Sequence, residues 1–155
     1  MRLSLLIIFF CFSFSDAFAG GSYTSLAEAL KSPADVKSLN LSGKGLTALS
    51  EDIGKLTNLE RLNVSSNTLT ALPKALFTLK KLRYLNLTAN KLKSLPAAIG
   101  TLKNLEELEV GFNQIAVLPK EVSGLSKLTR LVAAKNNLND LPIEFGQLPA
   151  LQIID

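Results

Sequence analysis

Apolar residues recur along this chain at uneven intervals that are themselves repeated. Over residues 82–100, leucine stands at 82, 85, 87, 92 and 95, and isoleucine at 99. This spacing matches neither the period of an amphipathic helix nor the alternation of a half-buried strand. The same spacing returns every 23 residues, in units that begin at Val36, Leu59, Leu82, Leu105 and Leu128. A fixed period of this size predicts a solenoid, in which each unit buries its apolar side chains against its neighbours.

The units share the pattern L-x-x-L-x-L-x-x-N-x-L, followed by x-x-L-P-x-x-I-G-x-L, with the first unit looser than the others. This pattern resembles the leucine-rich repeat, and the resemblance covers residues 36–154. It implies an α/β solenoid. The x-x-L-x-L segments are predicted to form a parallel sheet on the concave face, and the L-P-x-x-I-G-x-L segments short helical or 3₁₀ turns on the convex face.

One polar position repeats with the leucines, at Asn67, Asn90, Asn113 and Asn136, while Lys44 replaces it in the first unit. An evenly spaced row of amides can serve as a ligand track. A buried amide at a fixed turn can instead satisfy backbone groups of adjacent coils, as buried polar groups require. We favour this structural interpretation, which is also what the family resemblance implies.

The N-terminus has the layout of a secretory signal peptide. Arg2 precedes an apolar run from Leu3 to Phe14, and Ala17-Phe18-Ala19 forms a small-x-small cleavage site before Gly20. A lipoprotein signal would use Cys11, but Phe10 stands where a small residue is expected. The apolar run of 12 residues is short of the ~20 that a membrane-spanning helix needs. We therefore expect a protein that is secreted, periplasmic or on the cell surface, with no membrane span.

The cleaved chain would contain no cysteine, because Cys11 is the sole one. It would then have no disulfide, whereas the resemblance implies cysteine-rich caps for extracellular repeat domains of animals and plants. We infer a bacterial origin. Three N-x-[ST] sequons, at Asn40, Asn63 and Asn86, follow from the repeat pattern itself.

The organisation predicted is a signal peptide (1–19), an N-terminal capping helix (20–35) and a repeat domain (36–155) of five repeats and a partial sixth. Ser25 and Glu28 have capping-box spacing, Tyr23, Leu26 and Leu30 would share one helical face, and Pro33 would end the helix.

At the C-terminus, the 23-residue period places Leu151 and Ile154 at the first and fourth positions of a sixth unit. Ile153 would then face solvent on an open strand edge, which invites pairing with another chain. The expectation is self-association, or partner pairing, through residues 128–155.

Residue types needed for common catalytic chemistry are missing. The sequence has no histidine and no tryptophan, and neither Ser-x-x-Lys nor Gly-x-Ser-x-Gly occurs. Gly43-Lys44-Gly45 lacks the rest of a phosphate loop. Glu106, Glu107 and Glu109 are interpreted as a solvated acidic patch, because nothing predicts the burial that shifts carboxylate pKa values. We expect no enzyme activity, no cofactor and no metal site.

Binding in a solenoid is expected on the exposed positions of its sheet, because a rigid array presents them side by side. These are the third, fifth, seventh and eighth positions of each unit. They include the residue types that dominate binding hot spots. The residues predicted to bind a protein partner are Arg61, Tyr84, Asn86, Glu107, Glu109, Phe112 and Arg130.

The net charge of +4 supports a second candidate partner. A basic cluster around the third unit would attract sulfated glycans, through Lys80, Lys81, Arg83, Lys91 and Lys93. Nucleic acid is disfavoured because the chain is expected to be exported. The function favoured is non-enzymatic recognition of a protein, on or near a host cell as the family resemblance implies. The alternatives are the glycan binder and a structural protein of the cell envelope.

Overall fold

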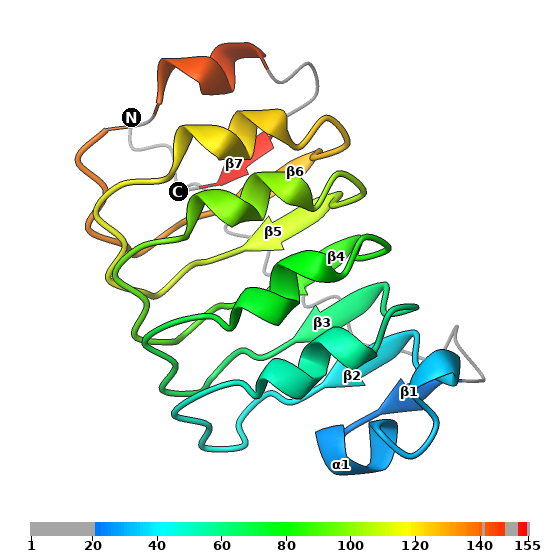
Figure 1. The fold of residues 1–155 in the computed structure, drawn as a ribbon. Helices are drawn as coiled ribbons and strands as arrows, with labels where there is room; N and C mark the ends of the chain where they lie inside the picture. Colours follow the sequence, from blue (N-terminus) through cyan, green and yellow to red (C-terminus); the bar gives the residue numbers. More distant parts are fainter. Residues whose placement is uncertain (1–20, 141, 148–151, 155) are drawn as a thin grey trace, which may run out of the picture.

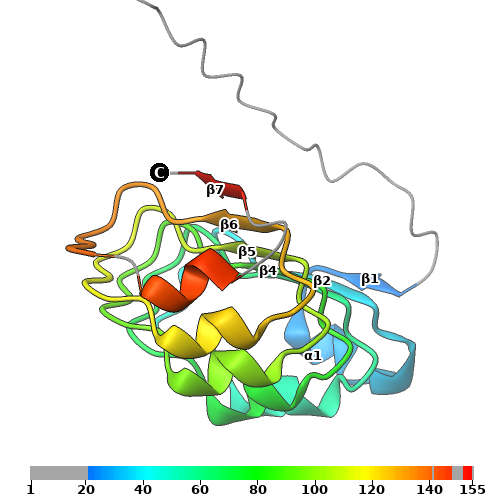
Figure 2. The same ribbon diagram turned by 90° about the horizontal axis from the view of Figure 1, so that it is seen from above.

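The computed structural model describes residues 21–140, 142–147 and 152–154. The chain coils into a stack, with a parallel sheet on one side and 3₁₀ helices on the other (Figures 1 and 2). Within these residues the sheet has seven strands in sequence order: β1 (Ser22–Tyr23), β2 (Ser38–Asn40), β3 (Arg61–Asn63), β4 (Tyr84–Asn86), β5 (Glu107–Glu109), β6 (Arg130–Val132) and β7 (Gln152–Ile154). The helical elements are α1 (Leu26–Ala29), η1 (Pro33–Asp35), η2 (Glu51–Lys55), η3 (Lys74–Thr78), η4 (Ala97–Thr101), η5 (Lys120–Gly124) and η6 (Ile143–Gln147). None of the described helices is long and apolar enough to cross a membrane.

The strands pair with the register that the 23-residue period predicts. From β2 to β6 each strand faces the equivalent residues of the next, so that Leu62 pairs with Leu85 and Leu85 with Leu108. These three leucines are fully buried, and the residues on either side of them are partly exposed. The alternation places one row of leucines in the core and leaves two rows of side chains on the sheet face.

The last strand departs from this period. Leu131 of β6 pairs with Ile153 of β7, so the final unit is one residue shorter than the others. Gln152 therefore pairs with Arg130, and Ile153 pairs with Leu131. The position that the period assigned to Ile153 is therefore off by one residue, while its expected exposure to solvent concerns a side chain outside those that the structure describes.

On the convex side, proline and glycine shape each turn. Pro96 precedes η4 with a φ of −71°, and its carbonyl accepts a hydrogen bond from Ile99 N (3.0 Å). Proline is already restricted to such a φ, which favours this start. Gly100 lies so close to η5 that a Cβ would approach Glu121 O within 2.5 Å. The glycine of the repeat therefore allows adjacent 3₁₀ helices to pack closely.

The N-terminal cap differs from the predicted helix. Tyr23 lies in strand β1, which pairs with β2 and extends the sheet by one strand. The helix is a single turn, and Ser25 Oγ accepts from Glu28 N (3.5 Å), as the capping-box spacing indicated. Pro33 begins the 3₁₀ helix η1 and does not terminate α1. Pairing with β2 explains the correction, because a strand satisfies the backbone groups at the edge of the first repeat.

Candidate functional site

The asparagine column is part of the internal framework. Asn90 Nδ2 donates to Val64 O (3.1 Å) and Leu87 O (3.0 Å), and Asn90 Oδ1 accepts from Leu69 N (3.0 Å). Equivalent bonds are made by Asn67, Asn113 and Asn136. Each amide thus joins two adjacent coils through their backbones. The structural interpretation of this column is confirmed.

A second asparagine column explains the three sequons. The Oδ1 atoms of Asn40, Asn63 and Asn86 accept from the backbone N–H two residues later, at 3.0, 2.9 and 2.8 Å. Asparagine forms such turns readily, and serine or threonine follows in the same turn. The sequons therefore arise from the turn chemistry of the repeat.

Glu109 interrupts this second column at the centre of the sheet face. It stands beside Asn86, whose Nδ2 donates to Glu109 Oε2 (2.6 Å). Tyr84 OH donates to the same oxygen (3.4 Å), and Arg130 donates to the other oxygen, Oε1. One carboxylate therefore links strands β4, β5 and β6.

Tyr84 lies between this carboxylate and a cation. The guanidinium carbon of Arg61 is 4.7 Å from the centre of the Tyr84 ring, a cation–π distance. Burial raises the pKa of the Tyr84 hydroxyl above its usual 10.0, and the negative charge of Glu109 raises it further. Tyr84 stays a neutral hydrogen-bond donor at neutral pH, with its ring held in place on the sheet.

The acidic residues of the fourth unit are ion-paired, which corrects the expectation of a simple solvated patch. Arg83 binds Glu106 through two hydrogen bonds of 2.9 Å, and Arg130 lies 3.6 Å from Glu107 as well as against Glu109. The pKa of Arg83 is raised above its ordinary value by its hydrogen bond to Glu106. The second, third and fifth positions of neighbouring units bring these opposite charges side by side.

Phe112 lies at the end of β5 with a backbone conformation unusual for an aromatic residue. Its φ is 53° and its side chain is 56% exposed. Equivalent positions are held by Ser66, Ala89 and Lys135, with φ between 55° and 57°, and by Gly43. A bulky residue at positive φ is uncommon and costs stability. Packing in the core gives no reason for phenylalanine here, which favours a role at the surface.

All seven residues predicted for a protein partner are brought together on β3 to β6 and the turn after β5. Ser38, at the equivalent position on β2, is buried beside the cap strand, so the face is limited to these later units. Sequence reasoning placed the residues correctly but missed their pairing. The repeat period carried that signal, since it sets Asn86 beside Glu109 and Glu107 beside Arg130.

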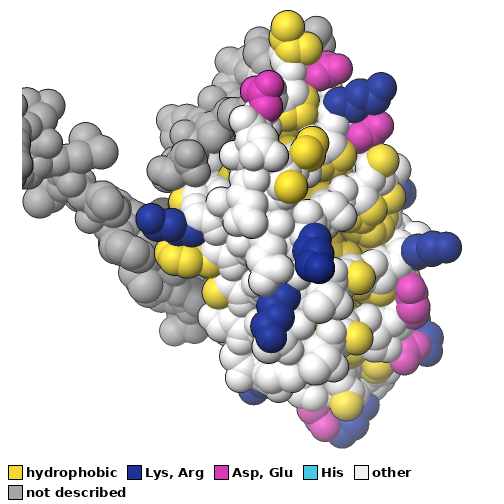
Figure 3. Space-filling view, turned by 90° about the vertical axis from the view of Figure 1, so that its left-hand side faces the viewer, with side chains coloured by type: hydrophobic (Ala, Val, Ile, Leu, Met, Phe, Trp, Pro, Cys, Tyr) yellow, Lys and Arg dark blue, Asp and Glu magenta, His cyan; other side chains and the backbone are white. Residues whose placement is uncertain are grey.

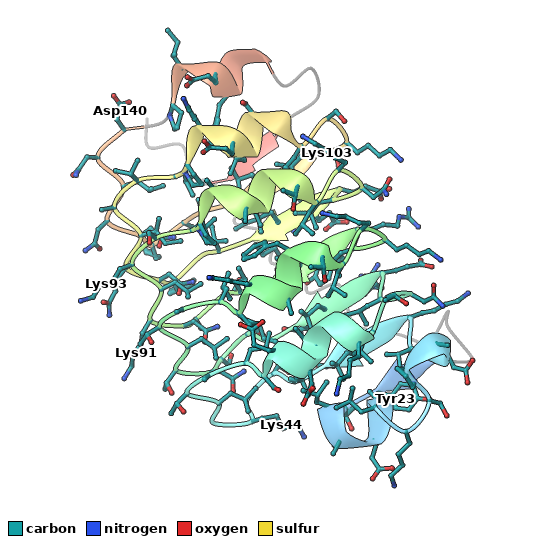
Figure 4. The ribbon with its side chains drawn as sticks, in the orientation of Figure 1. Tyr23, Lys44, Lys91, Lys93, Lys103 and Asp140 are labelled. Atoms are coloured by element: carbon teal, nitrogen blue, oxygen red, sulfur yellow. The ribbon has the colours of Figure 1, made fainter. Side chains whose placement is uncertain are left out.

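The predicted basic cluster does not form one patch. Lys80, Lys81 and Arg83 precede β4, where Lys80 Nζ donates to Phe77 O (2.9 Å) and Lys81 Nζ to Asn58 Oδ1 (2.6 Å). Lys91 and Lys93 follow β4 and lie on the left of Figure 4, across the molecule from Lys103, the residue equivalent to Lys80 in the next unit. The prediction treated neighbours in sequence as neighbours in space, whereas each coil reverses between them.

Within the described residues, no group of three or more carboxylate, histidine or cysteine side chains is arranged to hold a metal ion. The arrangement on the sheet face consists of ion pairs, amides and aromatic rings. These groups suit the recognition of another surface.

Two family models match the sequence, each described as a leucine-rich repeat: one over residues 74–155 and one over residues 34–92. The chain belongs to the leucine-rich repeat family. The strand register and the asparagine columns described above are therefore the framework of a leucine-rich repeat solenoid. Comparison with curated proteins finds no match.

Similar solved structures include two bacterial leucine-rich repeat proteins. A leucine-rich repeat protein of Leptospira interrogans is 37% identical with a TM-score of 0.67, over 86% of this chain and 40% of that one. Internalin C2 of Listeria monocytogenes is 30% identical with a TM-score of 0.72, over 84% of this chain and 55% of that one. This leucine-rich repeat chain thus spans about half the length of these relatives or less.

A plant structure shows the same fold with a bound partner. The ectodomain of a membrane receptor kinase from Arabidopsis thaliana was solved in complex with Casparian strip integrity factor 2. It is 26% identical with a TM-score of 0.64, over 85% of this chain and 16% of that one. Leucine-rich repeats serve as protein-interaction modules, and the sheet face described here has the side chains for that role.

Proposed function

We propose that this chain is an exported, non-enzymatic recognition module that binds a protein through its sheet face. The observation that carries the proposal is the set of aromatic and arginine side chains held in place on adjacent strands. Arg61 stacks on Tyr84, and the carboxylate of Glu109 holds Tyr84 and Arg130. Side chains that are already ordered lose less conformational entropy on binding, which raises affinity.

Phe112 supplies the exposed apolar contact beside this network. Tyrosine, arginine and other large side chains contribute most of the binding energy in protein interfaces. The small seventh-position residues Thr88, Gly111 and Ala134 leave the surface between them open. A partner surface can therefore approach the strands closely.

The finer parts of the proposal concern location and partner. The signal-peptide pattern of residues 1–19 supports export to the cell surface, the periplasm or the medium. Similarity to the Leptospira and Listeria proteins supports a bacterial protein. We extend the proposal to a host-cell or other cell-surface protein as the partner.

Photo-crosslinking tests this proposal on the full chain. A benzophenone amino acid replaces Phe112 in one variant and Ala97, exposed on convex helix η4, in a matched control. Each variant is incubated with intact candidate host cells and irradiated. We expect a discrete protein adduct from position 112 and not from position 97.

Adding Tyr84→Ala to the position 112 variant should remove the adduct, while circular dichroism shows that the solenoid remains folded. Equal adducts from both positions, or an adduct that survives Tyr84→Ala, would count against recognition by the sheet face.

A further inference from the structure

One side of the solenoid is formed by the turns that follow the strands, residues 43–49, 66–72, 89–95, 112–118 and 135–140, which we call the turn side. Its charged residues are Lys44, Lys91, Lys93 and Lys135, with Asp140 as the one carboxylate in these ranges. All four lysines are exposed. Figure 4 shows Lys91 and Lys93 on the left, Asp140 above them and Lys44 below. Figure 3 views this side directly and shows basic side chains on a largely polar surface.

Several cations elsewhere on the molecule are neutralised or hydrogen-bonded. Lys31 pairs with Glu28 and Lys55 with Asp52, both at 2.7 Å, and Lys103 Nζ donates to Gly124 O (2.7 Å). In contrast, no salt bridge to any of the four turn-side lysines occurs within the part of the chain that the structure describes. Their positive charges therefore add to a field that attracts anions.

The lysines are distributed along the whole stack, in the first, third and fifth units. Neighbouring strands of a sheet lie about 4.8 Å apart, so cations in alternate units are separated by roughly 10 Å along the stack. Lys44 contributes because it replaces the buried asparagine of the other units and is exposed. The result is a row of cations that runs along the stack.

The surface between these lysines carries hydroxyl and amide groups. Exposed Ser66, Thr70, Gln114 and Asn137 lie in the same turns. We propose that the turn side binds a linear anionic polysaccharide, with its sulfate or carboxylate groups at the lysines and its hydroxyl groups at the polar side chains between them. This site adjoins the sheet face at Phe112, and of the five-residue basic cluster expected from sequence it includes only Lys91 and Lys93.

A membrane surface fits this arrangement less well. The large exposed apolar residues of the turn side, Phe112 and Val117, both belong to the fourth unit. The lysines lie in the first, third and fifth units. A flexible polysaccharide can contact the whole row of lysines, whereas a lipid surface would make apolar contacts only at the fourth unit.

Binding to heparin, polygalacturonate and neutral dextran by isothermal titration calorimetry tests the proposal on the full chain. The turn-side variant carries Lys44→Gln, Lys91→Gln, Lys93→Gln and Lys135→Gln. A matched control removes the same charge from exposed lysines off the turn side, through Lys37→Gln, Lys74→Gln, Lys120→Gln and Lys127→Gln. Circular dichroism verifies that both variants are folded.

We expect the parent to bind one of the anionic polysaccharides and not dextran. The turn-side variant should lose affinity by roughly tenfold to a hundredfold with a shallower salt dependence, and the control by less than about threefold. Equal losses in the two variants would show an effect of net charge alone and overturn the proposal. So would failure to bind either polyanion at physiological salt, or tighter binding to phosphatidylserine vesicles or to single-stranded DNA. The four turn-side substitutions leave position 112 unchanged, so the crosslinking experiment can be repeated in that variant and the two proposals can fail independently.

Discussion

Replacing Asn90 by alanine tests the hydrogen-bonded framework that joins adjacent coils. The side chain is 8% exposed and bonds to backbone groups of its own and the preceding coil. All three of its carbonyl acceptors stay partnered in the variant, because Asn67 also donates to Val64 O, Asn113 to Leu87 O, and Ser66 N to Thr88 O. Leu69 N alone loses its bond to the amide oxygen.

The expected cost follows from this inventory. An unsatisfied buried N–H costs about 1–3 kcal/mol, and each lost hydrogen bond about 0.5–1.5 kcal/mol net. The cost of the unsatisfied N–H and the cost of the lost hydrogen bonds count partly the same interaction, so they do not simply add. We therefore expect Asn90→Ala to lower the free energy of unfolding by about 2–4 kcal/mol. A stable domain has about 5–15 kcal/mol in total, so the variant should still fold.

Urea denaturation followed by far-ultraviolet circular dichroism measures this cost. The chain has no tryptophan, so backbone absorption is the better signal. Asn137→Ala is the matched control, since Asn137 is exposed and belongs to the same turns. It should change stability by no more than about 0.5 kcal/mol. Equal effects of the two substitutions would refute the structural role of the column. A fall in the m-value for Asn90→Ala would show that the stack unfolds in separate blocks.

Two further predictions concern the core and the sheet face. Leu85→Ala, at a fully buried position, should destabilise by about 2–5 kcal/mol in the same titration, against about 0.5 kcal/mol or less for the exposed Ser126→Ala; similar values would contradict the strand register. Spectrophotometric titration of the parent and of Tyr84→Phe isolates the Tyr84 hydroxyl, whose pKa should lie above 10.0 because of burial and the charge of Glu109. Since the pKa of Tyr84 is raised in the folded state, the contribution of its neutral hydroxyl to the free energy of unfolding is complete below pH 10.0 and is lost as the pH rises through the folded-state pKa. An ordinary pKa would show that the network around Tyr84 does not form.

Much of the candidate site followed from the period alone. In a stack of equal units, residues separated by 23 positions lie on adjacent strands, so the partners of Arg61, Tyr84 and Glu107 are set by counting. The register also placed the leucines inside and the aromatic and charged residues outside. Counting did not show that Glu109 accepts hydrogen bonds from both Tyr84 and Arg130, because that depends on side-chain rotamers.

The sequence by itself determined the solenoid, its parallel sheet and the structural role of the asparagines. Each of these depends on interactions between identical positions of successive units, and a repeated pattern records such positions directly. Sequence was also sufficient for the row of binding candidates on the sheet, because side chains alternate strictly along a strand.

Only the tertiary structure decided where the period breaks and which charges meet. The N-terminal cap forms a strand because the edge of β2 offers backbone hydrogen bonds, and the last unit is one residue shorter, so that Ile153 pairs with Leu131. The lysines of the third unit lie apart because the chain reverses within each coil, so that Lys91 and Lys93 belong to the turns that follow the strands, as Lys44 and Lys135 do in other units. These outcomes depend on distances between residues that are far apart in the chain, and a one-dimensional pattern does not contain them.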